Sequence, residues 1–389
     1  MDFRLTEEQQ MLKKNIGDFA RQELAPFVRE IDDKGGFNWD IWRKIADLGL
    51  ASLAAPEEYG GDGIDDLLTQ TLVIEELARY DFSSAANVTS HWSCTHFLSA
   101  AGPEMLERYM RPLCTGETVG AFAITEPDSG SDVMSLRTSA VRDGDDYVIN
   151  GEKCFVTQSG EAAFTIVMAR TSQEKGTNGV SALLVDKDAP GLILGQKEDK
   201  LGYRGSTTRT VSFSDCRSPV TNIIGEEGKG LKTAMNMLVG GRILTAAQAL
   251  GQAQGALDAS VKHAKERVQF GRNIGSFQLI QGMLADMAIQ LESARLLVYY
   301  AAWLRDNNLP FTSAAAMAKT MATDTAMKIA VDAVQIYGGY GFMRDYPVEA
   351  FMRNVKITQI YEGTNQIQRL LIARELLDSK TSFKDMYGK

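Results

Sequence analysis

The period of the hydrophobic pattern changes twice along this 389-residue chain, and this change restricts the fold more than any other feature. Residues 5 to about 118 carry apolar side chains at near-helical spacing, as at Met11 and Ile16. From about 120 to 225 the chain has short β-rich runs separated by Gly, Asp and Pro, and beyond 228–230 the helical pattern returns. Segregated helical and β segments are typical of α+β proteins and not of alternating βαβ units.

We therefore predict three domains, a number that suits the chain length. An N-terminal α-helical domain covers 1–118, a middle β-domain of barrel or sandwich type covers 119–225, and a C-terminal four-helix-bundle domain covers 226–389. The expected strands lie in 147–151, 164–168, 180–185 and 210–213, and the expected C-terminal helices are 231–268, 277–306, 312–337 and one after 364.

Composition and charge exclude several classes of protein. The formal charge of −9 argues against a nucleic-acid partner, because phosphate binding needs a basic face. No apolar run approaches the roughly 20 residues that span a membrane, and the acidic start of the chain predicts no signal or transit peptide. Four widely spaced cysteines and three histidines predict reduced thiols, no metal site and a cytoplasmic location.

The segment Tyr-Glu-Gly-Thr-Asn-Gln-Ile-Gln-Arg at 361–369 is the strongest candidate for chemistry. It sets a single carboxylate, Glu362, beside a glycine and uncharged hydrogen-bonding side chains. Such a glutamate suits a base that takes a proton from carbon, provided that burial raises its pKa. The spacing fits equally a helix N-terminus with Thr364 as the cap and Glu362 in solvent, and this second arrangement is the more frequent one.

Three blocks of sequence resemble one known family. The 361–369 segment resembles the C-terminal active-site segment of the acyl-CoA dehydrogenases, which are flavoenzymes that oxidise acyl thioesters. Ala-Ile-Thr-Glu-Pro-Asp-Ser-Gly-Ser-Asp at 123–132 resembles their flavin-binding signature, and Gln-Ile-Tyr-Gly-Gly-Tyr-Gly-Phe at 335–342 resembles their second signature. The blocks have the family's order and spacing, and long blocks in register are more specific than a short glycine motif. The similarity runs from about Leu5 to Leu377.

The resemblance implies that the chain binds FAD. The implied cofactor-binding residues are Phe122, Ile124, Thr125, Gly130, Ser131, Phe155, Val156, Thr157, Arg267, Gln269, Phe270, Phe277, Gln278, Gln335, Ile336, Gly338, Gly339, Thr364, Asn365 and Gln366. In the family, the segment matching 267–278 reaches a flavin that a neighbouring subunit holds. The resemblance therefore also implies a flavin site shared between subunits, in a homotetramer built as a dimer of dimers. Phe155 stands where the family has Trp, so the surface that shields the flavin is smaller here.

The implied substrate is an acyl-CoA thioester. Its implied contacts are Ser131, Leu238, Arg242, Gly363, Thr89 and Ser93. The sequence departs from the family at Val239, which replaces an aspartate near the nucleotide end of CoA, and at Ala350, which replaces Lys or Arg.

The pattern also bears on the base and the acyl group. One branched-chain subgroup has its base at the position of Gly241, and a glycine cannot act as a base, so the resemblance assigns the base to Glu362. Glutaryl-type members carry an arginine near Ser84 or Ala85, which is missing here. We therefore expect an uncharged short, branched or cyclic acyl group.

The implied reaction is α,β-dehydrogenation of the thioester. Glu362 would take the α-proton while flavin N5 accepts the β-hydride, and the electrons would pass to an electron-transfer flavoprotein. Three alternatives stay open: a reductase that works in the opposite direction, an oxidase on the same fold, and a non-catalytic flavoprotein that binds acyl-CoA. Oxidases are typically longer, with an extra C-terminal helical domain.

Overall fold

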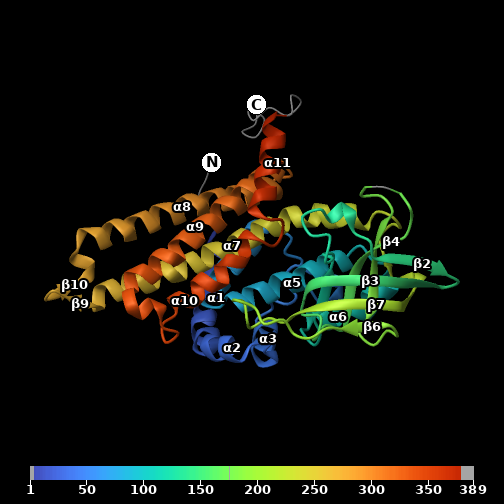
Figure 1. Ribbon diagram of the computed structural model, residues 1–389, viewed down its shortest axis with the longest axis horizontal. Helices are drawn as coiled ribbons and strands as arrows, with labels where there is room; N and C mark the ends of the chain where they lie inside the picture. The colour runs from blue at the N-terminus through green and yellow to red at the C-terminus, as the bar shows by residue number, and fades with distance from the viewer. Residues whose placement is uncertain (1–3, 175, 378–389) are drawn as a thin grey trace.

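The computed structural model describes residues 4–174 and 176–377, and it confirms the predicted order of helical, β and helical domains (Figure 1). The N-terminal helices are α1 Glu7–Phe19, α2 Val28–Lys34, α3 Trp39–Asp47, α4 Leu67–Tyr80, α5 Phe82–Leu98 and α6 Pro103–Cys114. The first helix begins with a capping box, in which the Thr6 side chain accepts from Gln9 N while the Gln9 side chain accepts from Thr6 N.

One mixed sheet forms the middle domain. Its strands are β1 Gly120–Ala123, β2 Ser139–Asp143, β3 Asp146–Thr157, β4 Phe164–Arg170, β5 Val180–Asp186, β6 Leu192–Leu194, β7 Thr208–Pro219 and β8 Ile223–Ile224. The strand order is β6-β7-β3-β2-β4-β5-β8, and β1 pairs in parallel with β4. Two register shifts against β7 let β3 continue through Thr157. The sheet therefore carries the predicted strand at 147–151 and the 155–157 segment on one strand.

Long helices return after the sheet. They are α7 Gly230–Glu266, α8 Gln278–Asp306, α9 Thr312–Tyr337, α10 Val348–Val355 and α11 Asn365–Leu377, and a small hairpin of β9 Val268–Gln269 and β10 Arg272–Asn273 joins α7 to α8. Many of the buried residues between these helices are alanines, which lets α7, α8 and α9 pack closely. The hairpin lies at the end of the bundle opposite the β-domain (Figure 1).

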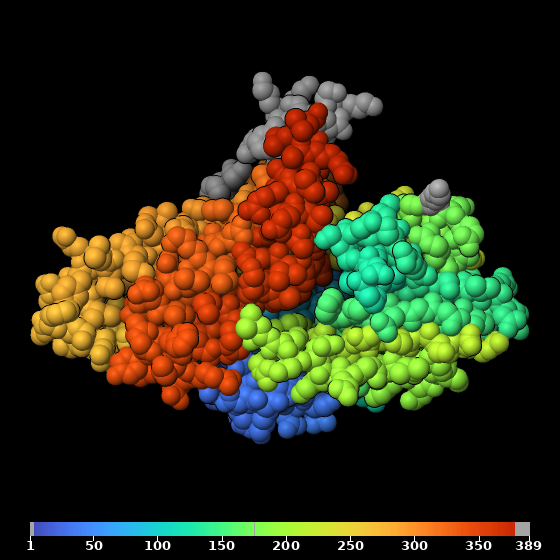
Figure 2. Space-filling model, in the orientation of Figure 1, coloured from blue at the N-terminus to red at the C-terminus, as the bar shows by residue number. Residues whose placement is uncertain are grey.

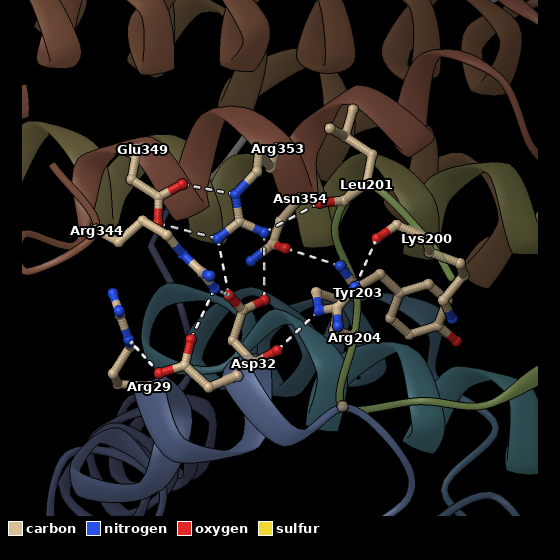
Figure 3. A network of polar contacts seen from close by, with 12 residues as sticks. Arg29, Asp32, Lys200, Leu201, Tyr203, Arg204, Arg344, Glu349, Arg353 and Asn354 are labelled. Carbon is tan, nitrogen blue, oxygen red and sulfur yellow. Dashed lines mark hydrogen bonds and ion pairs between the residues drawn. The ribbon is translucent and has the colours of Figure 1, made fainter. Parts of the chain in front are cut away.

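Apolar contacts and one charged network join the three domains. Helix α6 packs on the sheet through Tyr109, whose ring lies edge-on to Phe164 with centroids 5.2 Å apart. At the opposite junction Asp32 of α2 accepts hydrogen bonds from Arg353 of α10 (Nη2 to Oδ2, 2.8 Å) and from Arg344 (3.2 Å), as Figure 3 shows. The backbone carbonyl of Asp32 accepts from Arg204, in the β6–β7 loop (2.8 Å).

The space-filling view shows the C-terminal segment (red) next to the β-domain (green), with the N-terminal domain (blue) below them (Figure 2). The exact domain boundaries at 118/119 and 225/226 stay predictions, and the ends of the outer domains, 1–3 and 378–389, lie outside the described residues. Within the described part of the chain, we find no helix with the length and apolarity needed to cross a membrane.

Candidate active site

Glu362 lies in a tight turn that leads into α11. Its backbone is left-handed (φ 56°), as is that of Gly363 (φ 85°). A left-handed non-glycine residue costs on the order of 1–3 kcal/mol and persists only where its surroundings hold it. Gln368 of α11 is one such constraint, because its Nε2 donates to the carbonyls of Glu362 (3.3 Å) and Gly363 (3.0 Å). The fold therefore holds the carboxylate-bearing residue in a strained conformation.

The structure bears on both sequence interpretations of this segment. Thr364 does cap α11, because its Oγ1 accepts from Ile367 N (3.2 Å). Glu362 is not in solvent at its tip: Oε2 is shielded from water and has no hydrogen-bond partner among the described residues. An unpaired buried carboxylate oxygen is unusual, because burial without a hydrogen bond is costly.

Two buried cations flank this carboxylate. Burial raises the pKa of Glu362, while the positive charges of Arg242 and Lys319 lower it. Arg242 of α7 is 5% exposed, and burial lowers its pKa while the Glu362 charge raises it. A Cβ at Gly241 would lie 3.1 Å from Glu362 Oε2, so the glycine leaves room for the carboxylate. Contact of Arg242 with the nucleotide end of CoA stays a prediction.

A chain of hydrogen bonds runs from the turn that carries Glu362 to α5. The Tyr361 hydroxyl contacts Gln248 Oε1 of α7, Gln248 Nε2 donates to Thr89 Oγ1 (2.7 Å), and Thr89 Oγ1 donates to Ala86 O (3.0 Å). Ser93 Oγ donates to Thr89 O (2.9 Å), one turn further along α5. The two predicted α5 residues therefore belong to one polar wall beside the Glu362 turn.

The β-domain part of the predicted flavin site is well braced. The buried Lys153 donates to Glu126 Oε1 (2.7 Å) and to Ile124 O (3.1 Å), and Glu126 also accepts from the amides of Arg137 and Thr138. Cys154 N donates to Thr125 O (2.8 Å) and so ties the turn to β3. This bracing fixes the turn whose residues Phe122, Ile124, Thr125, Gly130 and Ser131 were predicted to meet the cofactor.

Phe155 and Thr157 present a surface beside this turn. Phe155 is 71% exposed and has φ 58°, an uncommon conformation for an aromatic residue. Val156 between them is buried in the sheet. Burial raises the pKa of the Tyr203 hydroxyl to about 12, and nearby Ser206 and Thr157 oppose this shift. An exposed ring on a strained strand is typical of a surface that a ligand covers.

A second group of predicted flavin residues lies at the far end of the bundle. The Arg267 guanidinium stacks on Tyr340 (5.0 Å), and Phe270 of the hairpin is 94% exposed with its ring 6.0 Å from that of Phe277. Helix α7 has 37 residues and is roughly 55 Å long at 1.5 Å per residue. One chain therefore does not bring this group together with the β-domain group (Figure 1).

The remaining predicted residues differ in what they offer a ligand. Gly338, with φ 62°, and Gly339 face open space, because a Cβ at either would meet nothing within 4 Å. Exposed side chains are those of Ser131, Gln269, Gln278, Gln335 and Gln366, whereas Ile336 is buried and Leu238 and Gly363 are half-buried. The Asn365 side chain is already bonded to Thr323 and Asp324 of α9. Any cofactor contact from Asn365 would come from its backbone.

Sequence reasoning missed Gln248, Tyr203 and Lys319. The sequence does carry a signal for Gln248 and Lys319. Each is a polar residue within an alanine-rich helix that is buried on several sides. Tyr203 had none, because it lies in a loop and reaches Thr157 only in the folded chain.

These surfaces fit a large planar cofactor with phosphates. They combine an exposed aromatic ring, backbone open at two glycines, and a cation on the hairpin side. Among residues 4–174 and 176–377, no group of three His, Cys, Asp or Glu side chains is placed to hold a metal ion.

Solved structures with the same fold support this interpretation. Butyryl-CoA dehydrogenase from Megasphaera elsdenii aligns with a TM-score of 0.92 at 44% identity, covering 97% of this chain and 100% of that one. A chain in the structure of the electron transferring flavoprotein of Acidaminococcus fermentans aligns with a TM-score of 0.93 at 46% identity and the same coverage. The FAD complex of PigA aligns at 0.92 and 29% identity, covering 97% and 99% of the two chains. Fold and site together define an oxidoreductase of the three-domain flavoprotein class.

Sequence comparison identifies the family. Models of the acyl-CoA dehydrogenase N-terminal, middle and C-terminal domains match residues 6–117, 121–216 and 228–377. A short-chain specific acyl-CoA dehydrogenase of Megasphaera elsdenii is 44% identical over 97% of this chain and 100% of its own length. An NADH-dependent acryloyl-CoA reductase of Anaerotignum propionicum is 43% identical over 97% and 96%. The chain belongs to the acyl-CoA dehydrogenase family.

Proposed function

We propose that this enzyme dehydrogenates a short, uncharged acyl-CoA to the 2-enoyl-CoA, with Glu362 as the base that removes the α-proton. The observation that carries this proposal is the Glu362 carboxylate, with Oε2 shielded, unpaired and flanked by Arg242 and Lys319. Shielding makes the carboxylate a stronger base, and the two cations oppose that effect so that the ionised form persists. This combination suits abstraction of a weakly acidic proton next to a thioester.

FAD, when bound, supplies the acceptor for the β-hydride. Thr125, Phe155 and Thr157 would hold it on the β-domain side, and Arg267 would neutralise its pyrophosphate from the hairpin side. The left-handed turn orients the Glu362 side chain and shields its Oε2 from water, so that water does not compete for the α-proton of the substrate.

The polar wall supports a short acyl group. Thr89, Gln248 and Tyr361 are joined by hydrogen bonds, so a longer alkyl chain would break these bonds and leave buried polar atoms unpaired. Ser84 and Ala85 are buried and uncharged, which leaves a distal acyl carboxylate without a cation from either position. The short-chain specificity named for the Megasphaera relative points the same way.

The flavin site would be completed by a second copy of the chain. Its two predicted halves lie at opposite ends of a long helix, and the hairpin and the start of α8 expose apolar residues, Phe270 in the hairpin and Leu279 in α8, which is 86% exposed. We carry over the predicted homotetramer, a dimer of dimers, as part of this proposal. Light scattering of the holoenzyme at nanomolar concentration is the test, and a monomer that keeps stoichiometric FAD would contradict a shared site.

The electron acceptor and the direction belong to the same proposal. The Acidaminococcus structure supports an electron-transfer flavoprotein as the acceptor, and the Anaerotignum relative keeps a reductase working in the opposite direction as the second candidate. Steady-state rates with oxygen, a ferrocenium acceptor, an electron-transfer flavoprotein and NADH plus enoyl-CoA would separate these cases. Free thiols at the four cysteines support the predicted cytoplasmic location.

The decisive experiment is anaerobic bleaching of the flavin by a panel of acyl-CoAs. We expect butyryl-CoA to reduce the flavin faster than octanoyl-CoA, isovaleryl-CoA or glutaryl-CoA. Failure of every thioester to bleach the flavin would overturn the proposed activity. A best rate with glutaryl-CoA would overturn only the assignment of the acyl group.

A further inference from the structure

Helix α9 carries a polar patch that faces the catalytic turn. Lys319 is fully buried, and its Nζ donates to Gly363 O (3.0 Å) and to Asn365 Oδ1 (2.9 Å). One turn further on, Thr323 bonds to Asn365 Oδ1 (3.2 Å), and Asp324 accepts from Asn365 Nδ2 (2.7 Å). The residues on either side in α9 are mostly buried alanines, so this patch interrupts an otherwise apolar face.

Making these two hydrogen bonds with a lysine carries a large desolvation cost. An ammonium loses much of its hydration on burial, and the two acceptors that Nζ bonds to, Gly363 O and Asn365 Oδ1, are not carboxylates. A neutral donor would satisfy the Gly363 carbonyl at a lower desolvation cost. A buried charge at this place therefore points to a role in the reaction rather than in stability.

We propose that Lys319 is a positioning residue for proton abstraction, which fixes the Gly363 carbonyl and thereby holds the left-handed turn that presents Glu362. Gly363 follows Glu362 directly, and its carbonyl accepts from both Lys319 Nζ and Gln368 Nε2, each at 3.0 Å. Two donors from two different helices leave this peptide little freedom to rotate. The inference rests on the proposed function of Glu362 as the base.

The charge of Lys319 adds a second effect. The charged groups that act on it are Glu362 in the turn, Asp324 on its own helix and Arg242 on α7, and Arg369 of α11 pairs with Asp324 (2.7 Å). Burial lowers the pKa of Lys319 to about 8, so the ammonium persists at neutral pH and loses its charge above that value. While charged, it lowers the pKa of Glu362 and so keeps the base ionised at lower pH.

The test compares three variants of the FAD-loaded enzyme. Lys319→Met removes the donor and the charge, Lys319→Gln keeps a donor without the charge, and Lys328→Met is the control. Lys328 lies on the same helix but is exposed and pairs with Asp332 (2.6 Å). We expect Lys319→Met to slow flavin reduction by about 10- to 100-fold. This loss is smaller than the loss of about 10²–10⁴-fold expected when the base itself is removed.

The pH profile of flavin reduction reports the charge. In both Lys319 variants the acid limb should move to higher pH and the inflection near pH 8 should disappear, whereas Lys328→Met should overlay the wild type. Unchanged profiles in both Lys319 variants would overturn the electrostatic part of the proposal.

Amide hydrogen exchange over 362–365 reports the turn without any turnover. We expect at least tenfold faster exchange in Lys319→Met, near-wild-type exchange in Lys319→Gln, and no change in Lys328→Met. Wild-type exchange in Lys319→Met would overturn the positioning role. Because this measurement needs no substrate, it stands even if no acyl-CoA bleaches the wild-type flavin, so the two proposals fail separately. If Lys319→Met does not fold, Lys319→Gln is measured alone. An unshifted pH profile in Lys319→Gln would then overturn the proposed effect of the Lys319 charge on Glu362.

Discussion

Asp32 and Glu362 are both carboxylates at junctions between domains, and the fold treats them in opposite ways. Asp32 is 7% exposed and both of its oxygens accept from Arg353, with Arg344 as a further donor (Figure 3). Glu362 has an oxygen without a partner among the described residues, and its two neighbouring cations act on it through space.

This contrast separates a structural carboxylate from the one proposed to act as a base. Three hydrogen bonds from two arginines occupy most of the lone pairs of the Asp32 carboxylate, and with the bond from Arg204 to its backbone carbonyl they make Asp32 a fixed anchor for α2, α10 and the β6–β7 loop. The unpaired oxygen of Glu362 costs stability and leaves a lone pair free to act. Four experiments test this contrast, and they follow in order of decreasing expected effect.

The largest effect is expected at the unpaired carboxylate. Glu362→Gln keeps the size of the side chain and removes the base, so flavin reduction by butyryl-CoA should slow by about 10²–10⁴-fold. FAD content should stay at the wild-type level. Stopped-flow absorbance of the flavin measures the rate, and reduction at nearly the wild-type speed would remove Glu362 from its assigned role.

The paired carboxylate should affect stability instead. Asp32→Ala removes one of the two carboxylates that pair with Arg353, whose side chain is 15% exposed and which keeps Glu349, and the free energy of unfolding should fall by about 2 kcal/mol. The control is Asp33→Ala, because Asp33 is an exposed neighbour that also pairs with Arg344 (2.7 Å). Chemical denaturation should give a nearly unchanged midpoint for the control. Equal losses in the two variants would show that burial of Asp32 has no special weight.

The polar wall combines both features, since Gln248 bonds to Tyr361 beside the Glu362 turn and yet is paired at both ends. Gln248→Ala opens space, so the ratio of kcat/KM for hexanoyl-CoA over butyryl-CoA should rise on the order of tenfold. Gln254→Ala is a matched control, because Gln254 is on the same helix but bonds to Asp258 and Arg295. A ratio that does not respond to Gln248→Ala would place the end of the acyl pocket elsewhere.

The smallest effect concerns stability against pH. The pKa of Glu362 is raised in the folded state, so its contribution to stability is fully present below the unfolded value and is lost as pH rises through the folded value. Glu362→Gln removes this dependence. The melting temperature of wild type minus that of the variant should therefore fall as pH rises from 4 to 8, by on the order of 1 °C. A difference that rises with pH would mean that the carboxylate is stabilised in its ionised form.

Much of the fold was predictable because it depends on long periodic segments. The predicted helices 277–306 and 312–337 match α8 Gln278–Asp306 and α9 Thr312–Tyr337, since many turns share one apolar period. The β3 strand was harder to predict, because the irregularity between Lys153 and Val156 breaks the alternation.

The site was predictable only where the chain itself carries the pattern. Glu362 was singled out from its own segment and the family resemblance that the segment carries, whereas the partners of Lys319 and Gln248 come from elements distant in sequence. The left-handed backbone of Glu362 depends on donors from α9 and α11, which no local propensity describes. A polar side chain within an alanine-rich helix is a marker that further sequences of this kind could be searched for.

The far position of the hairpin has a consequence for genetics. If each copy completes its neighbour's flavin site, a lesion at Arg267 in one copy and a lesion at Glu362 in its neighbour fall in the same site of a mixed pair. Two inactive alleles expressed together, Arg267→Ala and Glu362→Gln, would then form some sites that contain no lesion. Recovery of activity in such heterozygotes would be intragenic complementation, and it follows directly from where α7 ends.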